Sequence, residues 1–377
     1  MKIGILTMHY RRNYGGILQS YSLYKYLKSL NHDVTIIDYR EDTSINNYHI
    51  VSVFQELYKR MLQLIKKAFC HNHSLSILPT RPLSNELLQA FQSFKDEYLQ
   101  YTRPVNNKTI KEVVNNFDMV VIGSDQVWTS VKYKKLIFFG DFGIEYSGRL
   151  ISYAACSINS IPPLYQKRKL SRLLNRFDYI SVRDETTYNF VESINKELNI
   201  SMVADPTFLH DFKEFSSQTY EKENYIFAYV LGSEIQGGHE AVLSKIKSKY
   251  GDIKIVSVVI SNVSLEAEKF ADIVIDTASP IEWVSLIAHA KFVYTDSFHG
   301  CVFSMKFHKP FLGYYNSGNR ASRLLDLKNK FGLNNIVSSV HEVNLSSEIN
   351  YEKIDMINDK ITNKSCKFIN EAISINK

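Results

Sequence analysis

The apolar run Phe292-Val293-Tyr294 leads into Thr295-Asp296-Ser297-Phe298-His299-Gly300, and Cys301-Val302-Phe303-Ser304-Met305-Lys306-Phe307 follows directly. Lys309-Pro310 then separates this segment from a second apolar run, Phe311-Leu312-Gly313-Tyr314-Tyr315. The order of apolar strand, tight polar turn, short helix, proline and second strand predicts one βαβ unit. In a parallel sheet the turn of such a unit lies at the carboxyl end of its first strand, where open α/β sheets bind their ligands.

His299 is the residue of this turn that can carry chemistry. The pattern places it near a helix N-terminus, where free backbone N–H groups and the helix dipole favour an anion. A titratable imidazole at that position suits acid/base work on a phosphorylated substrate. Local chemistry leaves another interpretation open, because a lone histidine in a turn is more often a hydrogen-bonded loop residue, and Ser297 could simply cap the helix.

Composition limits the kind of protein this can be. A chain of 377 residues is too long for one average core, so we expect two domains. No window approaches the roughly 18 apolar residues of a membrane span, and the first residues turn polar too soon for a signal peptide. The four scattered cysteines have neither metal-ligand spacing nor a disulfide pattern. These features predict a cytoplasmic, reduced protein without a metal ion or a bound cofactor.

The charge balance is mildly basic. A formal net charge of +6 fits phosphorylated substrates or an anionic membrane surface as well as it fits nucleic acid, so charge alone does not choose among them. Residues 54–69 predict an amphipathic helix with a basic face. Such a helix can lie on the inner face of an anionic membrane, although a packed helix with a solvated basic face is the more common case. Peripheral membrane contact therefore stays open as the less favoured alternative.

Strand and helix patterns alternate in two blocks, which a polar linker at 214–224 separates. The first block, 1–213, opens with a strand, a helix and a strand, and then breaks its rhythm at about 41–110, which predicts a helical insertion. The second block, 214–377, repeats the pattern, and its last helix, from about 351 to 373, could cross back onto the first. The sequence therefore predicts an α/β fold of two Rossmann-type, doubly wound domains that face one cleft.

Three further polar turns follow apolar strands in the first block. Gly15 and Gly16 precede a helix predicted at about 17–30, and they either let a ligand approach the backbone closely or simply make the turn. Trp128, in the turn after a strand at about 118–122, could hold the face of a sugar ring or only pack against the insertion. Arg183 also ends a strand, and its guanidinium group could grip a carboxylate or phosphate in a bidentate fork. Pairing of Arg183 with its acidic neighbours alone fits equally well.

Five segments of the chain together resemble the polysaccharide pyruvyl transferase family. They occur in the family's order, from near the N-terminus to about residue 330, and the set is more specific than any of its members. The segments are Asn13-Tyr14-Gly15-Gly16-Ile17-Leu18-Gln19, Gly123-Ser124-Asp125-Gln126-Val127-Trp128, Ser181-Val182-Arg183-Asp184-Glu185, Asp205-Pro206-Thr207-Phe208-Leu209 and Thr295-Asp296-Ser297-Phe298-His299-Gly300. The resemblance implies a GT-B-like fold and transfer of pyruvate from phosphoenolpyruvate onto a sugar as a cyclic ketal.

The resemblance also implies roles for individual residues. His299 matches the family's essential histidine and Arg183 its substrate-gripping arginine, so these two are the expected catalytic residues. A basic residue after the histidine is characteristic of the family, and Arg320 is the best match, with Arg323 as its neighbour. Many members have arginine two residues before the histidine, where this chain has Ser297. Arg320 or Arg323 would have to supply the missing anion clamp, or else the donor differs.

By the same resemblance, two sets of residues would surround the two substrates. The co-substrate phosphoenolpyruvate, on the side of the second domain, would contact Arg183, Ser297, Phe298, His299, Gly300, Arg320 and Arg323. The acceptor, a sugar or lipid-linked oligosaccharide on the side of the first domain, would contact Asn13, Tyr14, Gly15, Gly16, Asp125, Gln126 and Trp128. Nucleic acid is not an expected partner, and the sequence leaves the oligomeric state open.

Two other functions fit the same fold, because a fold does not fix its chemistry. A glycosyltransferase could use a nucleotide sugar in the same cleft, although residues 291–323 hold no paired-glutamate motif for a nucleotide ribose. A non-catalytic glycan-binding relative would explain Ser297 as a lost clamp.

Overall fold

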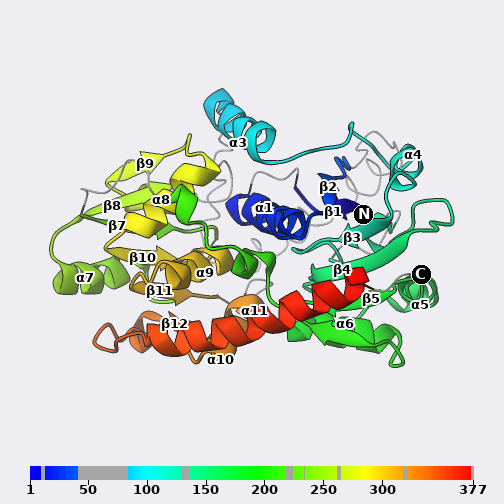
Figure 1. The fold of residues 1–377 in the computed structure, drawn as a ribbon. Helices are drawn as coiled ribbons and strands as arrows, with labels where there is room; N and C mark the ends of the chain where they lie inside the picture. Colours follow the sequence, from blue (N-terminus) through cyan, green and yellow to red (C-terminus); the bar gives the residue numbers. More distant parts are fainter. Residues whose placement is uncertain are drawn as a thin grey trace, which may run out of the picture.

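The computed structural model describes residues 1–9, 13–40, 84–129, 136–216, 224–232, 234–260, 265–316 and 321–374. Arg320 and the basic helix predicted at 54–69 lie outside these residues. Figure 1 shows the described chain as two α/β halves, with the first strands and helices in blue to green and the second set in green to orange.

Six parallel strands form the sheet of the first half, in the order β2-β1-β3-β4-β5-β6. The strands are β1 (Lys2–Leu6), β2 (Asp33–Ile36), β3 (Met119–Ile122), β4 (Arg149–Ala155), β5 (Tyr179–Val182) and β6 (Ile200–Met202). The chain order reverses between β1 and β3, and such a switch point is where ligands bind outside the carboxyl ends of the strands.

The described helices of the first half are α1 (Tyr14–Ser29), α3 (Asn85–Tyr98), α4 (Lys111–Val114), α5 (Lys167–Leu174) and α6 (Glu185–Ile194). Side-chain caps start three of these five helices, α1, α3 and α6. The Asn13 side chain accepts a hydrogen bond from Gly16 N at 3.4 Å and so caps α1. The helix therefore starts three residues before the predicted position, and the glycine pair lies inside its first turn instead of in the preceding loop. Of the predicted insertion, residues 84–110 are described, and they contain α3.

The second half repeats the plan with a sheet of order β12-β11-β10-β7-β8-β9, again parallel throughout. Its strands are β7 (Tyr225–Tyr229), β8 (Lys254–Val258), β9 (Ile273–Ile275), β10 (Phe292–Thr295), β11 (Phe311–Tyr314) and β12 (Ile336–Val337). Its helices are α7 (His239–Tyr250), α8 (Pro280–His289), α9 (Phe298–Lys306), α10 (Ala321–Phe331) and α11 (Tyr351–Ser374). The βαβ unit predicted around His299 is confirmed as β10, α9 and β11. The prediction of two doubly wound, Rossmann-type α/β units is also confirmed.

One hydrophobic core runs through both halves, because α1 lies between the two sheets (Figure 1). Tyr14, at the start of α1, is fully buried and stacks on Trp283 of α8 with ring centroids 5.4 Å apart. Its hydroxyl group donates a hydrogen bond of 2.7 Å to Ala278 O in the second half. This apolar contact fixes the N-terminal end of α1 against the second sheet.

The last helix, α11, reaches from the second half across to the first (Figure 1). Ser365 Oγ accepts a hydrogen bond of 2.8 Å from Ala204 N, just after β6. Near the other end of the first sheet, Arg149 Nη1 donates to the carbonyl oxygen atoms of Ala372 and Ile373. The helix therefore supplies acceptors to two buried groups of the first half.

Candidate functional site

The carboxyl ends of strands from both sheets meet at the candidate site. His299 is the second residue of α9, directly after β10, and Ser297 caps this helix by accepting a hydrogen bond of 3.2 Å from Gly300 N. A side chain on Gly300 would place its Cβ 2.5 Å from Thr295 Oγ1. Since Thr295 Oγ1 also accepts a hydrogen bond from Ser297 N at 3.0 Å, the turn that carries His299 is held tightly.

The imidazole ring of His299 lies against the backbone of α1. A Cβ atom on Gly15 would come within 1.9 Å of His299 Nδ1, so only glycine leaves room for the ring. On the other side, His299 Nε2 lies 3.7 Å from Asp205 Oδ2, which is an ion-pair distance and longer than a hydrogen bond. His299 is 5% exposed, and its buried Nε2 has no hydrogen-bond partner in the described part of the chain.

Arg183 follows β5, and its side chain points toward Asp205 Oδ2, the atom that His299 Nε2 also approaches. Its Nη1 donates a hydrogen bond of 2.6 Å to Asp205 Oδ2, and its guanidinium group lies over the ring of Phe298 at 4.9 Å from the ring centroid. The predicted alternative, pairing with the acidic neighbours alone, does not describe this arrangement, because Arg183 pairs with Asp205 in addition to the ion pair of 3.9 Å between its Nε and Asp184 Oδ2. Arg183 is 3% exposed, and its Nε and Nη2 are buried without a hydrogen-bond partner among the described residues.

Asp205 connects the arginine and the histidine, although the sequence analysis gave it no role. Thr207 donates to Asp205 Oδ1 through its backbone nitrogen at 2.9 Å and its hydroxyl group at 2.7 Å, which leaves Oδ2 for Arg183 and His299. Burial opposes the charged form, yet His299 and Arg183 hold the pKa of Asp205 well below its usual range. An acid followed by proline directly after a short strand was the available signal.

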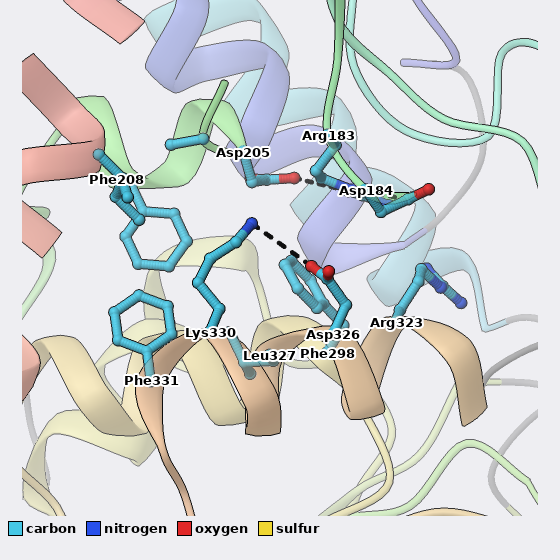
Figure 2. A pocket seen from close by; sticks show the side chains of 12 residues that line it. Arg183, Asp184, Asp205, Phe208, Phe298, Arg323, Asp326, Leu327, Lys330 and Phe331 are labelled. Carbon is cyan, nitrogen blue, oxygen red and sulfur yellow. Dashed lines mark hydrogen bonds and ion pairs between the residues drawn. The ribbon is translucent and has the colours of Figure 1, made fainter. Parts of the chain in front are cut away.

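A second guanidinium group, that of Arg323 on α10, lines a pocket beside Arg183, and Figure 2 shows the residues around it. Burial and the nearby positive charge of Arg183 lower the pKa of Arg323, and its Nε has no hydrogen-bond partner in the described chain. Lys330 and Asp326, also on α10, form an ion pair of 3.4 Å at the pocket. The pocket has a volume of about 10 Å³, about the room of one water molecule.

Cys156 lies near Arg183 but does not have the properties of a nucleophile. Its Sγ donates a hydrogen bond of 2.9 Å to Asp184 Oδ2, while Asp184 Oδ1 caps α6 by accepting from Thr187 N at 2.8 Å. Burial raises the pKa of the Cys156 thiol to about 12, so the thiol stays protonated at neutral pH.

The predicted acceptor residues separate into two groups. Asn13, Gly15, Gly16 and Asp125 lie together around the N-terminus of α1, where a Cβ atom on Gly16 would be 3.7 Å from Asp125 Oδ2. Gln126 is half-buried in the same turn as Asp125.

Two other predicted acceptor residues need correction, because both are fully buried. Trp128 stacks on Phe139 with centroids 5.2 Å apart, and its Nε1 donates to Phe138 O at 2.8 Å, so it offers no free face to a sugar. Tyr14 is used in the contact between the halves described above. Both side chains act as core residues.

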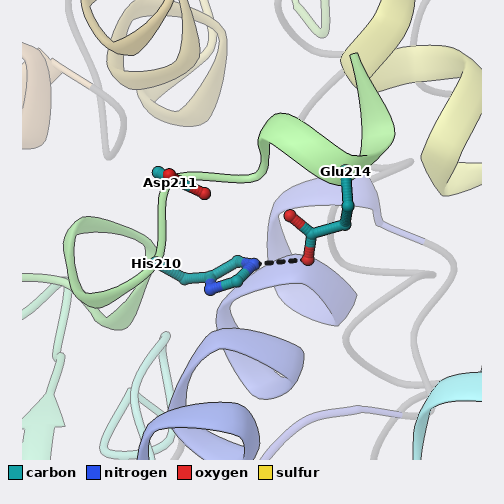
Figure 3. Close-up of side chains that lie close together, drawn as sticks. All are labelled: His210, Asp211 and Glu214. Carbon is teal, nitrogen blue, oxygen red and sulfur yellow. Dashed lines mark hydrogen bonds and ion pairs between the residues drawn. The ribbon is translucent and has the colours of Figure 1, made fainter. Parts of the chain in front are cut away.

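Figure 3 shows another cluster of polar side chains, at the connection between the two sheets. His210 Nε2 lies 2.5 Å from Glu214 Oε1, and the hydroxyl group of Tyr21 donates to the same oxygen at 2.9 Å. Asp211 pairs with Lys213 at 3.3 Å. These partners explain the cluster as a link between α1 and the connecting segment, so we assign no metal to it. Within the described residues, no helix has the length and apolar character needed to cross a membrane.

The site as a whole suits a small anion. The N–H donors of Arg183 and Arg323 that have no partner in the described part of the chain can bind carboxylate or phosphate oxygen atoms in a forked geometry. His299 Nε2 is a buried, titratable atom in the same site and can move a proton to or from a bound molecule.

Comparisons with known proteins agree with this arrangement. The similar solved structures include UDP-GlcNAc 2-epimerase from Methanocaldococcus jannaschii in complex with UDP-GlcNAc and UDP, with 13% identity, 99% of each chain covered and a TM-score of 0.51. UDP-GlcNAc 2-epimerase from Neisseria meningitidis bound to UDP-GlcNAc has 10% identity, 100% of each chain covered and a TM-score of 0.51. Arabidopsis thaliana UGT89C1 complexed with UDP has 11% identity, with 98% of this chain and 99% of that chain covered, and a TM-score of 0.50.

These likenesses show the fold alone, which is GT-B-like, as predicted. No curated protein matched the sequence. The model of the family described as polysaccharide pyruvyl transferase matches residues 13–318, which include His299, Arg183, Asp205, Asp125 and the glycine pair of α1. The chain therefore belongs to the polysaccharide pyruvyl transferase family.

Proposed function

We propose that this protein transfers the pyruvyl group of phosphoenolpyruvate onto a sugar of a surface polysaccharide or its precursor, as a cyclic ketal. The observation that carries the proposal is the set of buried donors on Arg183, beside His299 Nε2, that have no hydrogen-bond partner among the described residues. A buried donor without a partner costs about 1–3 kcal/mol, and more when it is charged, so a ligand that supplies acceptors is strongly favoured.

Phosphoenolpyruvate suits these donors because it carries a phosphate and a carboxylate on three carbons. Arg183 and Arg323 would hold the two anionic groups, and the free N–H groups at the start of α9 would add to the attraction. Arg323 would then supply the clamp that Ser297 lacks, since Ser297 Oγ is used to cap α9. The protein needs no metal ion or bound cofactor in this proposal.

His299 would transfer the proton that starts the reaction. When the methylene carbon of phosphoenolpyruvate gains a proton, the neighbouring carbon becomes electrophilic, and a sugar hydroxyl group adds to it. Phosphate then leaves, and a second hydroxyl group of the same sugar closes the ketal. Asp205, ion-paired with Arg183 and 3.7 Å from His299 Nε2, would keep both side chains in place and balance their charge.

Phosphate release from phosphoenolpyruvate tests the proposal, with a panel of galactosyl, glucosyl and mannosaminyl acceptors. We expect release that depends on the acceptor and that His299→Ala loses by about 10²–10⁴-fold. His341→Ala is the matched control, because His341 is exposed and takes part in none of the contacts described for the site. Full pyruvyl transfer by His299→Ala would overturn the proposed role.

Thermal denaturation adds a test that does not depend on finding the right sugar. Phosphoenolpyruvate at 100 times its Kd should stabilise the protein by about 2.7 kcal/mol. Stabilisation by a nucleoside diphosphate instead of phosphoenolpyruvate would favour a glycosyltransferase, the function that shares this fold.

A further inference from the structure

Asp125 has a backbone conformation that only a few residue types tolerate. It follows β3 with φ of 69°, in the left-handed region where asparagine, aspartate and glycine are the common residues. Its carbonyl oxygen accepts hydrogen bonds from Val127 N at 2.7 Å and from Cys156 N at 3.0 Å, which hold this conformation in place. Backbone strain of this kind is concentrated at functional sites, because it aims a side chain that ordinary geometry would turn away.

The side chain of Asp125 is aimed at the N-terminus of α1. Its Oδ2 lies 3.7 Å from the position of a Cβ atom on Gly16, while the His299 ring lies against Gly15. Because consecutive Cα atoms are about 3.8 Å apart, the carboxylate and the imidazole border the same short piece of backbone from the two sheets. The charge of Asp125 also acts on Arg183 and Arg323, the two proposed clamps.

The carboxylate of Asp125 is not used to hold the structure together. Within the described residues it makes no hydrogen bond and no ion pair, and it is only half-buried. Three other carboxylates lie near Arg183, and each is occupied: Asp205 by Arg183 and Thr207, Asp184 by Cys156 and Thr187, and Asp326 by Lys330. Asp125 is therefore the acid of this group whose oxygen atoms remain available to a hydroxyl group.

Pyruvyl transfer needs a second proton-transfer group besides His299. In the addition step the methylene carbon gains a proton while the attacking hydroxyl group loses one, and one imidazole cannot give and take a proton at the same moment. We infer that Asp125 is the general base that removes the proton from the acceptor hydroxyl group, opposite His299 as the acid. This inference rests on the proposed function.

The proton balance closes over the two steps. In the first, the hydroxyl oxygen bonds to the central carbon, its proton passes to Asp125, and the carbon–carbon double bond takes a proton from His299 to become a methyl group. In the second, the bond to the phosphate oxygen breaks, and the leaving phosphate takes the proton from Asp125. The second hydroxyl group then bonds to the same carbon and returns a proton to His299, so both side chains recover their starting states.

Two substitutions at Asp125 keep its backbone conformation and remove its basicity. Asparagine and glycine both adopt the left-handed region, so Asp125→Asn and Asp125→Gly are expected to fold normally. Asn31→Gly is the matched control, because Asn31 has φ of 62° in an exposed turn. We expect both Asp125 variants to lose about 10²–10⁴-fold in turnover, with phosphoenolpyruvate bound at least as tightly as by the wild type because a nearby negative charge is gone.

Restoration of turnover by added formate distinguishes a general base from a structural residue, because formate can replace a missing carboxylate but cannot repair a disturbed fold. It should restore turnover in Asp125→Gly, whose missing carboxylate leaves room for it, and not in His299→Ala. Wild-type turnover by Asp125→Asn, a parallel loss of phosphoenolpyruvate binding, or no restoration by formate would each overturn the assignment. If the wild type itself neither binds nor consumes phosphoenolpyruvate, the proposed function fails and this inference falls with it. If the wild type turns over and Asp125→Asn turns over at the same rate, only the role of Asp125 is overturned, and the proposed function stands.

Discussion

Two of the buried places where the halves meet are built from opposite chemistry. In the first, Tyr14 stacks on Trp283 and its hydroxyl group is paired with Ala278 O; Trp283 Nε1 has no partner among the described residues, but it is neutral. In the second, Arg183, Asp205 and His299 meet, and the described chain offers no hydrogen-bond partner to Arg183 Nε, Arg183 Nη2 or His299 Nε2.

This difference indicates that the aromatic contact holds the two halves together and that the charged contact is a site for a ligand. Aromatic stacking and burial stabilise the first contact without any further partner. At the second contact, burying charged donors without a hydrogen-bond partner costs more free energy than burying a neutral N–H group does. We therefore expect substitutions at the first contact to lower stability, and substitutions at the second to separate stability from activity.

The largest effect is expected at the aromatic contact. Tyr14→Ala should lower the free energy of unfolding by about 3–5 kcal/mol, because it removes a fully buried ring and leaves a cavity. Tyr14→Phe should cost only about 1–2 kcal/mol, since it removes the hydroxyl group and leaves Ala278 O unpaired. Urea denaturation measures both values. If Tyr14→Ala costs less than 1 kcal/mol, this contact does not hold the halves together.

The next largest effect is expected for Asp205→Asn. This variant should lower the free energy of unfolding by about 3 kcal/mol, because it leaves Arg183 buried without its counter-ion. The pKa of Asp205 is lowered in the folded protein, so its contribution is complete above the unfolded pKa of about 3.9 and is lost as the pH falls below that value. The difference in stability between wild type and Asp205→Asn should therefore shrink below about pH 4. Denaturation curves at several pH values measure it, and a constant difference down to pH 2 would contradict the assignment.

The glycine pair offers a comparison within a single turn of helix. Gly15→Ala would push a Cβ atom into the His299 ring, so we expect activity to fall at least about 100-fold, or about 2.7 kcal/mol. Gly16→Ala meets only ordinary contacts, the nearest at 3.6 Å, so it should lose much less activity than Gly15→Ala while gaining up to about 1 kcal/mol of helix stability. Phosphate release and thermal denaturation of both variants decide this. Equal activity of the two would show that His299 does not need its place against α1.

The smallest effect on stability, and one of opposite sign, is expected for Arg323→Met. Arg323 and Arg183 repel each other, and no described residue forms an ion pair with Arg323. Methionine preserves most of the apolar stem, so the free protein should become more stable by about 1 kcal/mol. The same variant should lose the stabilisation that phosphoenolpyruvate gives to the wild type. A less stable variant that still responds to phosphoenolpyruvate would mean that Arg323 is structural.

Local patterns predicted the fold well, because each strand, turn and cap is encoded within a few residues. Ser279 and Glu282 form the capping box that starts α8, and these two residues lie only three positions apart in the sequence. The position of His299 at the start of α9 follows from the same kind of local signal. The start of α1 was misjudged, because two glycines favour a turn on propensity alone, while the cap by Asn13 and the approach of His299 require a helix there.

The parts of the site that the sequence did not reveal depend on contacts between distant residues. Tyr14 and its partner Ala278 are 264 positions apart, so nothing near Tyr14 distinguishes a core residue from an acceptor residue. Trp128 is buried by Phe139, which the sequence analysis did not connect with it. Asp205 was singled out only within a motif, and its pairing with both Arg183 and His299 became visible once β6 and β10 were placed in one structure.

The long-range contact of α11 has a consequence for how the chain folds. Arg149 Nη1 in β4 and its acceptor Ala372 O are 223 residues apart, so the ribosome completes the strand long before it releases the helix. At 5–20 residues per second, this part of β4 stays uncovered for roughly 10–45 s. A nascent first half is thus exposed to aggregation during synthesis, and faster release of the C-terminal segment should raise the yield of folded protein.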